Sequence, residues 1–443
     1  MHSCTPVPKL SFPDISSMEL QAVKGTRDFY PEQMRVRNWL FSIWREVSEC
    51  SGFEEYDACV LEHEDLYVRK AGDEITQQLY NFQDKSGRKL SLRPEMTPSL
   101  ARMILQHHRA LIFPVKWFSI PQCFRYERMT KGRRREHFQW NADIIGQPGE
   151  IAEAEILMLL INAMQKMGLN ADDITIFIND RRILNAVLEQ VGIPEPHHAE
   201  VLVILDKRDK ISPEALAELL REQGIAAAAI PQLLELLECP DLKALKSRLG
   251  NPEPFAGLET LFGLLEASGH GDFLKFDVSI VRGLSYYTGP VFEMNSPDKS
   301  QRAICGGGRY DSLLSTYGGE TIPAVGFGFG DVVVLDVLEA KGKQPQLDQR
   351  LDVMVIPFET DQAGTALQVA SSLRKSGLRV DCNFSMRKMK KVLQQADDAG
   401  VKQAVLLFPQ ELEQGQVVVR NMAERSQQNV ALADLQSGWL TSQ

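Results

Sequence analysis

The sequence has no long hydrophobic run. None of its apolar segments approaches the roughly 20 residues that a membrane-spanning helix needs, which excludes a membrane span. Only seven cysteines occur among 443 residues, and none forms a Cys-x-x-Cys pair, which argues against a disulfide framework and against a zinc site. Residues 1–20 lack both the apolar stretch of a signal peptide and the arginines of a transit peptide. We therefore expect a short N-terminal tail on a cytoplasmic protein.

Positive charge is also in deficit. Lysine and arginine number 49 against 59 aspartate and glutamate, so the formal net charge is -10. Any nucleic acid must therefore be met by a local basic surface. The proportions of hydrophobic residues (44%) and charged residues (24%) are those of an ordinary globular protein, and the length suggests two to four domains.

Hydrophobic periodicity predicts a mixed-sheet domain over residues 21–340. Over residues 194–254 leucine, alanine and glutamate dominate and strand formers are sparse, which predicts a helical insertion. Helices are expected at residues 32–51, 97–107 and 150–167. Strands are expected at residues 79–82, 89–93, 115–120, 123–126, 138–145, 174–178, 274–280, 286–294 and 322–329.

A polar segment, residues 341–346, precedes a regular alternation of strands and helices. The predicted order is strand 351–356, helix 361–376, strand 379–383, helix 386–399 and strand 403–408. This βαβαβ order implies a small, mostly parallel sheet covered by helices, so residues 350–443 are predicted to form a second domain. The fold class is α/β in the broad sense that includes α+β.

The first candidate site is a basic loop, residues 131–135, between two predicted strands. The loop alone is typical of a solvated turn. Arg125, however, lies between aromatic residues inside the first strand, and its planar guanidinium can grip phosphate oxygens with two hydrogen bonds. Glu127 and Gln139 add directional partners, and the combination favours a phosphate site.

Glu95 lies just before a predicted helix. Its carboxylate can cap the helix N-terminus, or it can bind the ammonium group of a ligand. On spacing alone, the sequence favours the cap.

Two further motifs carry an arginine beside glycine. Arg282 precedes Tyr286 and Tyr287 at the start of a predicted strand, which can line a polar pocket or form an ordinary turn. The run of three glycines at 306–308 allows the backbone to approach a ligand closely, or forms a flexible turn.

Glycine also alternates with phenylalanine over residues 326–330, like a strand with one bare face that can admit a flat ring or another backbone. The spacing is not a dinucleotide-binding fingerprint, and no Walker loop is present.

Together, and in this order, the motifs resemble one family, the histidyl-tRNA synthetases of class II, from Val23 to about Leu435. The segments 281–287 (VRGLSYY) and 306–311 (GGGRYD) resemble its two histidine-specific signatures. Residues 124–127 with the basic loop resemble class II motif 2. The form of this loop is similar to a plant-organelle-like branch that also occurs in some bacteria.

The resemblance implies a class II catalytic domain built on an antiparallel sheet, with a helical insertion, followed by an anticodon-binding domain. It implies a histidine–tRNA ligase that activates L-histidine with ATP to histidyl-adenylate and transfers histidine to the 3′ end of tRNA(His). Mg2+ would neutralise the departing pyrophosphate. The resemblance also implies a homodimer.

The resemblance further implies roles for individual residues. Arg282 and Arg125 would be catalytic: Arg282 would stabilise the transition state, and Arg125 would hold the α-phosphate. ATP would be bound by Arg125, Glu127 and Arg133. The ammonium group of histidine would meet Glu95, Thr97 and Asp143, with Gln139 alongside, and Tyr286 and Tyr287 would contact the imidazole, with Tyr310 nearby. The full histidine-binding set is Glu95, Thr97, Gln139, Asp143, Arg282, Tyr286, Tyr287 and Tyr310, and the tRNA-binding set is Arg387, Lys388, Lys390 and Lys391.

The sequence departs from the family pattern at three places. The arginine of motif 3 is missing, because Val332 and Val333 stand where the family usually has Glu-Arg. Asp143 replaces a glutamate that is common elsewhere, and residues 129–131 differ from the usual motif 2 loop.

Two alternatives share the fold. One is a non-catalytic relative that binds histidine as a sensor, such as the regulatory subunit of ATP phosphoribosyltransferase. The other is a synthetase-like interaction domain. The retained Arg282 and the C-terminal domain favour the enzyme.

Overall fold

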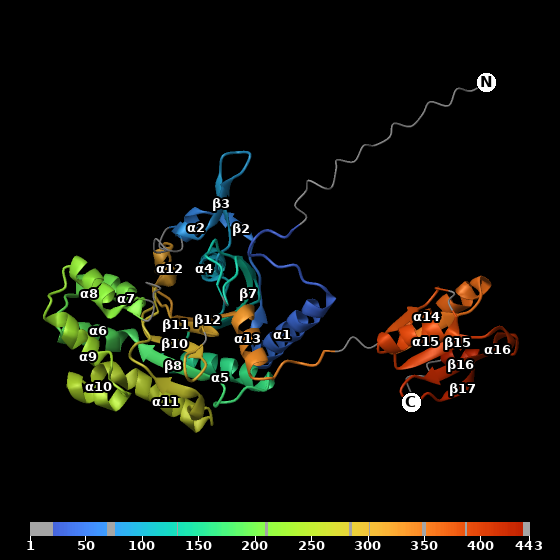
Figure 1. The fold of residues 1–443 in the computed structure, drawn as a ribbon. Coiled ribbons are helices and arrows are strands. Elements are labelled where there is room, and N and C mark those ends of the chain that lie inside the picture. Colours follow the sequence, from blue (N-terminus) through green and yellow to red (C-terminus); the bar gives the residue numbers. More distant parts are fainter. Residues whose placement is uncertain are drawn as a thin grey trace, which may run out of the picture. The chain divides into compact units, whose positions relative to one another are not determined.

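The computed structural model of the protein describes residues 21–68, 76–130, 132–208, 211–282, 286–300, 302–347, 351–385 and 388–436. The chain divides into two compact units, Met1–Pro345 and Gln346–Gln443 (Figure 1). The predicted tail, residues 1–20, lies outside the described residues. Within the described ranges, no helix is both long and apolar enough to cross a membrane.

The first unit is built on a nine-stranded sheet in the order β1-β5-β7-β12-β11-β10-β8-β9, with β6 paired to β7. Most neighbouring strands are antiparallel, while β1–β5 and β8–β9 are parallel pairs. The predicted mixed fold with an antiparallel-dominated sheet is confirmed. The strands are β1 Glu54–Glu55, β5 Val115–Ser119, β6 Gln122–Phe124, β7 Glu136–Ile145, β8 Thr175–Asp180, β9 Leu274–Phe276, β10 Pro290–Asn295, β11 Cys305–Arg309 and β12 Ala324–Gly330.

Strand β7 shows how the sequence divides the two faces of this sheet. Every second side chain from Phe138 to Ile144 is apolar, and this face packs against helices α1 (Pro31–Cys50) and α5 (Glu150–Lys166). The ring of Trp140 stacks on Trp44 of α1 at a centroid distance of 5.8 Å, and both side chains are fully buried. Burying such a side chain contributes about 1.5–3 kcal/mol. The polar residues of β7 therefore lie on the opposite face.

The glycine run at 306–308 is a strand rather than the turn that the sequence equally allowed. Its residues are buried and pair with β10 on one side and β12 on the other. A Cβ atom on Gly307 would lie 2.2 Å from the backbone oxygen of Gly326. Glycine is needed here because the neighbouring strands leave no room for a side chain.

A cluster of helices follows β8 and ends before β9 (Figure 1). Helices continue beyond the predicted insertion, 194–254, through α11, whose Leu258, Leu261 and Leu265 are buried in the main core. The helices are α6 Arg181–Gln190, α7 His198–Leu205, α8 Pro213–Glu222, α9 Ala229–Leu236, α10 Leu242–Leu249 and α11 Ala256–Ala267.

Among the described residues, the first unit also contains a smaller antiparallel sheet, in the order β2-β4-β3, and further helices. Its strands are β2 Leu61–His63, β3 Tyr80–Gln83 and β4 Lys89–Leu92. The helices are α2 Asp65–Val68, α4 Thr97–His107, α12 Leu313–Thr316 and α13 Asp331–Ala340.

The second unit contains the predicted βαβαβ order and two more strands. Strands β13 (Val353–Pro357), β14 (Val380–Cys382) and β15 (Gln403–Leu407) are parallel, with helices α14 (Ala363–Lys375) and α15 (Met389–Asp398) between them. Strands β16 (Gln416–Asn421) and β17 (Gln427–Ala431) extend the sheet as an antiparallel hairpin, in the order β14-β13-β15-β16-β17. Short helices α16 (Pro409–Glu413) and α17 (Leu432–Gln436) flank the hairpin.

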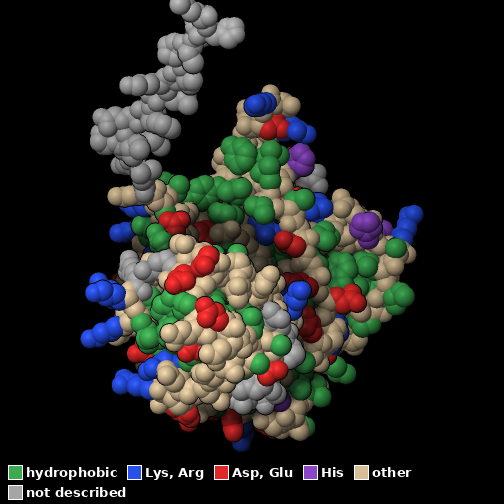
Figure 2. All heavy atoms as spheres, turned by 90° about the vertical axis from the view of Figure 1, so that its right-hand side faces the viewer, with side chains coloured by type: hydrophobic (Ala, Val, Ile, Leu, Met, Phe, Trp, Pro, Cys, Tyr) green, Lys and Arg blue, Asp and Glu red, His purple; other side chains and the backbone are tan. Residues whose placement is uncertain are grey.

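The surface carries both signs of charge. On the face shown in Figure 2, acidic and basic side chains are interspersed with hydrophobic ones. This agrees with a chain whose excess of acidic residues is modest.

Candidate active site

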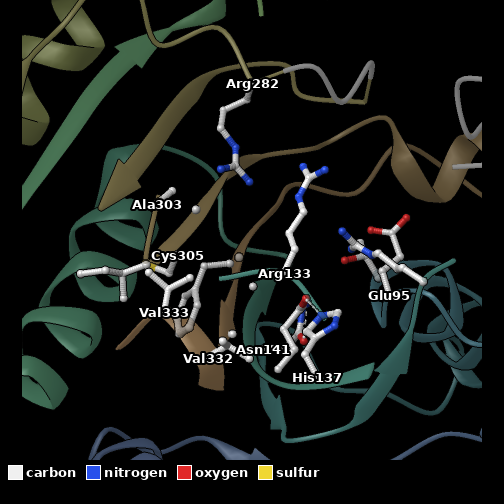
Figure 3. Close-up of a pocket in the computed structure, with 18 of the residues that line it drawn as sticks. Glu95, Arg133, His137, Asn141, Arg282, Ala303, Cys305, Val332 and Val333 are labelled. Carbon is white, nitrogen blue, oxygen red and sulfur yellow. Dashed lines mark hydrogen bonds between the residues drawn. The ribbon is translucent and has the colours of Figure 1, made fainter. Parts of the chain in front are cut away.

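One cavity of about 270 Å³ collects the predicted catalytic, histidine-binding and ATP-binding residues. Figure 3 shows Arg133 and Arg282 both projecting into it. The cavity is lined by all of the predicted side chains, namely Glu95, Thr97, Arg125, Glu127, Arg133, Gln139, Asp143, Arg282, Tyr286, Tyr287 and Tyr310. Glu95 and Tyr310, which lie 215 positions apart in the sequence, therefore share one space that a single ligand can occupy.

The polar face of β7 forms one wall of this cavity. His137, Gln139, Asn141 and Asp143 alternate along the strand and all line the pocket. The Gln139 Nε2 atom donates to Asn141 Oδ1 at 2.9 Å, and Gln139 Oε1 lies 3.2 Å from His137 Nε2. These hydrogen bonds hold the amide groups in a fixed row. Burial and the nearby Arg125 lower the pKa of His137 to about 4, so its ring is neutral at physiological pH.

The glycine-rich strands leave space for these side chains. A Cβ atom on Gly326 would lie 2.0 Å from the Asp143 carboxylate, and one on Gly328 would lie 2.6 Å from Gln139 Nε2. A Cβ atom on Gly306 would lie 1.9 Å from Arg282 Nη1. The bare faces of β11 and β12 thus admit the functional groups of neighbouring elements, because these glycines carry no side chain of their own.

Arg282 has an unusual backbone conformation. Its φ is 52°, in the left-handed region that non-glycine residues rarely adopt. Its guanidinium Nη1 lies 3.3 Å from Glu293 Oε2. Burial lowers the pKa of Arg282, but Tyr287 and Glu293 raise it, and the net shift is upward. The pocket therefore holds a permanent positive charge.

A second group of charges comes from the loop between β6 and β7. Arg125 donates through Nε to the Pro94 carbonyl at 2.9 Å, which fixes the side chain beside α4. The Glu127 carboxylate lies 3.0 Å from Arg133 and 4.0 Å from Arg125. Glu127 thus bridges the two arginines and orients their remaining N–H groups, which suits an anion with several oxygens.

Glu95 does not cap helix α4. The N-cap residue is Met96, and no side chain caps the helix, so the expectation from spacing alone is wrong. Instead Glu95 is buried and lines the pocket, with Thr97 at the first helical position beside it. Burial raises the pKa of Glu95, while Arg125 opposes this shift. A buried carboxylate of this kind is suited to a positively charged ligand group.

The tyrosines and Asp143 form a connected group at the site. The Tyr310 hydroxyl donates a short hydrogen bond to the Asp143 carboxylate. The Tyr286 ring lies 6.0 Å from the Tyr310 ring and 5.0 Å from the Tyr287 ring, measured between centroids. Burial raises the pKa of Asp143 to about 7, and the hydrogen bond from Tyr310 limits the rise.

The predicted tRNA-binding residues lie in the second unit. Lys388, Lys390 and Lys391 are exposed at the start of α15, and Arg387 lies outside the described residues. Lys388 is the N-cap residue of this helix.

Sequence reasoning missed three polar side chains at the site. His137 and Asn141 line the pocket, and their alternation with Gln139 and Asp143 is a signal that predicts a shared face once β7 is recognised as a strand. Glu293, the partner of Arg282, lies on β10. Nothing in its local sequence distinguishes it, because the contact depends on how the 278–282 loop folds over the sheet.

Comparison with known proteins finds related families and relatives over both units. A family model described as histidyl-tRNA synthetase matches residues 25–330, and one described as anticodon binding domain matches residues 352–439. The histidine–tRNA ligase, chloroplastic/mitochondrial, of Arabidopsis thaliana is 44% identical over 95% of this chain and 86% of its own length. The histidine–tRNA ligase of Opitutus terrae is 38% identical over 94% of this chain and 97% of its own.

Solved structures share the fold. The histidyl-tRNA synthetase of Nostoc sp. PCC 7120 superposes with a TM-score of 0.78 at 24% identity, covering 96% of this chain and 99% of that chain. A protein of Bacillus halodurans described as an ATP phosphoribosyltransferase regulatory subunit/histidyl-tRNA synthetase superposes with a TM-score of 0.72 at 22% identity, covering 90% of this chain and 99% of that chain.

The sheet, the arginine-bearing motif 2 hairpin and the separate C-terminal unit define a class II aminoacyl-tRNA synthetase. The matches extend over both units and include the two histidine signatures. The chain belongs to the histidyl-tRNA synthetase family. The predicted family, fold class and ligase activity are confirmed.

Proposed function

We propose that this cavity activates L-histidine with ATP to histidyl-adenylate and then transfers the histidyl group to the 3′ end of tRNA(His). The observation that carries the proposal is the convergence of Arg125, Arg282, Glu95 and the Asp143–Tyr310 pair on one cavity. Cationic groups for a triphosphate and acceptors for an amino acid thus lie together. The roles that we assign to the individual residues are proposals, which are based on this geometry and on the family resemblance.

Histidine is held at both ends. Its ammonium group meets Glu95, Thr97 and Gln139, which all line the cavity. The resemblance placed Asp143 at the ammonium group. We change this role, because the Asp143 carboxylate is hydrogen-bonded to Tyr310 among the aromatic rings. Its carboxylate accepts a hydrogen bond from the imidazole N–H.

ATP lies along the arginines. Arg125 holds the α-phosphate, and Arg133 with Glu127 orients the terminal phosphates. A carboxylate oxygen of histidine attacks the α-phosphorus, the bond to pyrophosphate breaks, and pyrophosphate leaves. Arg282 stabilises the negative charge of the transition state. No protein nucleophile takes part, so catalysis comes from positioning and electrostatics.

Mg2+ fits this site as a partner of the substrate. It prefers oxygen ligands and is commonly held by one or two carboxylates together with phosphate oxygens. Among the described residues, no group of three or more His, Cys, Asp or Glu side chains is arranged to hold a metal. Glu127 is the carboxylate suited to share the ion with the phosphates, and the ion would neutralise the charge of the leaving pyrophosphate.

The C-terminal unit binds the anticodon region of the tRNA, with salt-dependent phosphate contacts from Lys388, Lys390 and Lys391. Arg387 is part of the same proposed set. We also propose a homodimer, as the family resemblance implies, and a cytoplasmic location. The Arabidopsis relative is described as chloroplastic/mitochondrial.

A histidine sensor is the rival function for this fold. A sensor needs neither a fixed cation at the α-phosphate nor an anticodon-binding unit. This chain has Arg125 and Arg282 in one cavity and a matched anticodon-binding domain. These features favour the enzyme.

The purified protein with Mg2+ should exchange pyrophosphate into ATP when histidine is supplied. A site that pairs the polar groups of its substrate rejects analogues that lack them by about 10⁴-fold, so we expect this preference for histidine over the other amino acids. Exchange measured with each amino acid in turn checks the result. Histidine binding without exchange would establish the sensor instead.

The pH profile of the reaction should report the Asp143 carboxyl. Its pKa of about 7 means that the group is neutral below this pH and charged above it, so kcat/KM for histidine should fall as the pH drops through 7. Tyr310→Phe removes the hydrogen bond that favours the charged form, and the acidic limb should move to higher pH.

The imidazole of free histidine titrates in the same pH range. Because the unaltered enzyme and Tyr310→Phe use the same substrate, this titration cannot cause a difference between their pH profiles. Tyr30→Phe, at an exposed tyrosine, is the matched control and should leave the limb in place. If the acidic limb of the pH profile is unchanged in Tyr310→Phe, Asp143 does not take part in histidine recognition.

A further inference from the structure

The backbone of Arg282, which has a left-handed conformation, accepts a hydrogen bond from a neighbouring element. The carbonyl oxygen of Arg282 accepts a hydrogen bond from Arg181 Nη2 at 2.6 Å. Arg181 is the first residue of α6 and is buried, with 8% of its surface exposed. A buried charged donor at this distance makes a strong hydrogen bond.

The adjoining loop is fixed from the same place. Asn179, near the end of β8, is fully buried, and its Nδ2 atom donates to the Val278 carbonyl at 2.9 Å and to the Ile280 carbonyl at 3.0 Å. Three carbonyl groups of the segment 278–282 are thus bound by two side chains that lie two positions apart.

The same strand also supports the partner of Arg282. Strand β8 pairs with β10 in a register that sets Asn179 opposite Val291. Glu293, two residues further along β10, forms the ion pair with Arg282. Strand β8 and the first residue of α6 therefore contact both the loop that ends at Arg282 and the strand that carries its counter-ion.

Helix α6 does not need the Arg181 side chain for its start. Asp180 is its N-cap and accepts from the backbone N–H of Arg182. Burial lowers the pKa of Arg181 to about 10, which keeps the guanidinium charged at neutral pH. A buried charge that donates a hydrogen bond to the backbone of the proposed catalytic residue needs an explanation in function.

We infer that Arg181 and Asn179 are positioning residues, which set the backbone of segment 278–282 so that the Arg282 guanidinium points into the cavity. The inference rests on the proposed role of Arg282 in adenylate formation. Without the hydrogen bond to its carbonyl, Arg282 can relax towards an ordinary backbone conformation, and its guanidinium then leaves the place where charge develops.

Arg181→Met tests the inference, alone and combined with Arg282→Ala. Misplacing a catalytic group by about 1 Å costs about 10²-fold, so Arg181→Met should lower the single-turnover rate of adenylate formation by about this factor. The affinity for histidine should stay unchanged. In the Arg282→Ala background, Arg181→Met should cause no further loss, since residues that act as a unit are not additive.

Arg221→Met is the matched control, because Arg221 is an exposed arginine of α8 that pairs with Glu218 on the surface. It should leave the rate unchanged. Arg181→Lys keeps the charge and one donor and should restore part of the rate. If Arg181→Met fails to fold, the same comparison is made with Asn179→Ser, in the unaltered enzyme and in the Arg282→Ala variant.

Two results would overturn the inference. One is a rate of adenylate formation in Arg181→Met equal to that of the unaltered enzyme. The other is that Arg181→Met lowers this rate by the same factor in the unaltered enzyme and in Arg282→Ala. The proposed function fails separately, if Arg282→Ala itself forms adenylate as fast as the unaltered enzyme.

Discussion

Arg282→Ala should lower histidine-dependent ATP–pyrophosphate exchange by about 10³-fold, since removing one preorganised charge from a transition state costs this much. The guanidinium shares the cavity with Arg125 and carries a permanent charge. Histidine binding should persist, because Glu95, Asp143 and the tyrosines hold the amino acid in our proposal. Exchange kinetics and calorimetric titration with histidine together check the result.

Arg425→Ala is the control for this substitution. Arg425 also has a positive φ, 58°, but it is exposed in the second unit. Arg425→Ala therefore also removes an arginine side chain from a position with left-handed backbone conformation, but it leaves the cavity unchanged. Equal exchange in Arg282→Ala and Arg425→Ala would contradict a catalytic role, and joint loss of histidine binding and folding would make Arg282 structural.

The sequence predicts the fold best where local pattern and tertiary environment agree. Strand β7 alternates apolar and polar residues because one face packs on α1 and α5 and the other lines the cavity. Strand β11 is the opposite case. Three consecutive glycines have low strand propensity, and they form a strand here because they pair with β10 on one side and β12 on the other.

The second unit shows a similar limit. Its parallel strands and helices have distinct periods, and the sequence predicts all five elements. The hairpin of β16 and β17 was missed, although residues 416–421 are rich in valine, because its register depends on pairing with β15. The strand propensity of a segment does not predict which other strand it pairs with.

The site itself was predicted through resemblance rather than from single motifs. Local sequence alone predicts that Glu95 caps a helix and allows the glycine run to form a turn. The structure contradicts both of these interpretations. His137 and Asn141 were accessible from strand periodicity. The contact between Arg282 and Glu293 was not, because it joins a loop to a strand 11 residues away.

Adjacent glycines of β11 should respond to alanine in different ways. In Gly306→Ala, the new methyl group would lie 1.9 Å from Arg282 Nη1, at the mobile end of a side chain. The guanidinium can move away without disturbing the sheet, so the protein should fold normally. Because the charge is displaced by an ångström or more, exchange should fall by about 10²-fold or more.

In Gly307→Ala, the methyl group would instead meet the Gly326 backbone oxygen at 2.2 Å and the Phe292 ring at 2.6 Å. Two paired strands must then separate, and the expected result is a loss of stability by several kcal/mol, as for severe overpacking of a core (~1–3 kcal/mol or more). Gly263→Ala, at an exposed position of α11 with no atom within 4 Å, is the matched control. Thermal unfolding and exchange should thus separate the two neighbours, with activity lost at normal stability in Gly306→Ala and stability lost in Gly307→Ala. If Gly306→Ala kept full activity, the Arg282 guanidinium would not need its observed place against the bare face of β11, and its proposed catalytic role would fail with it.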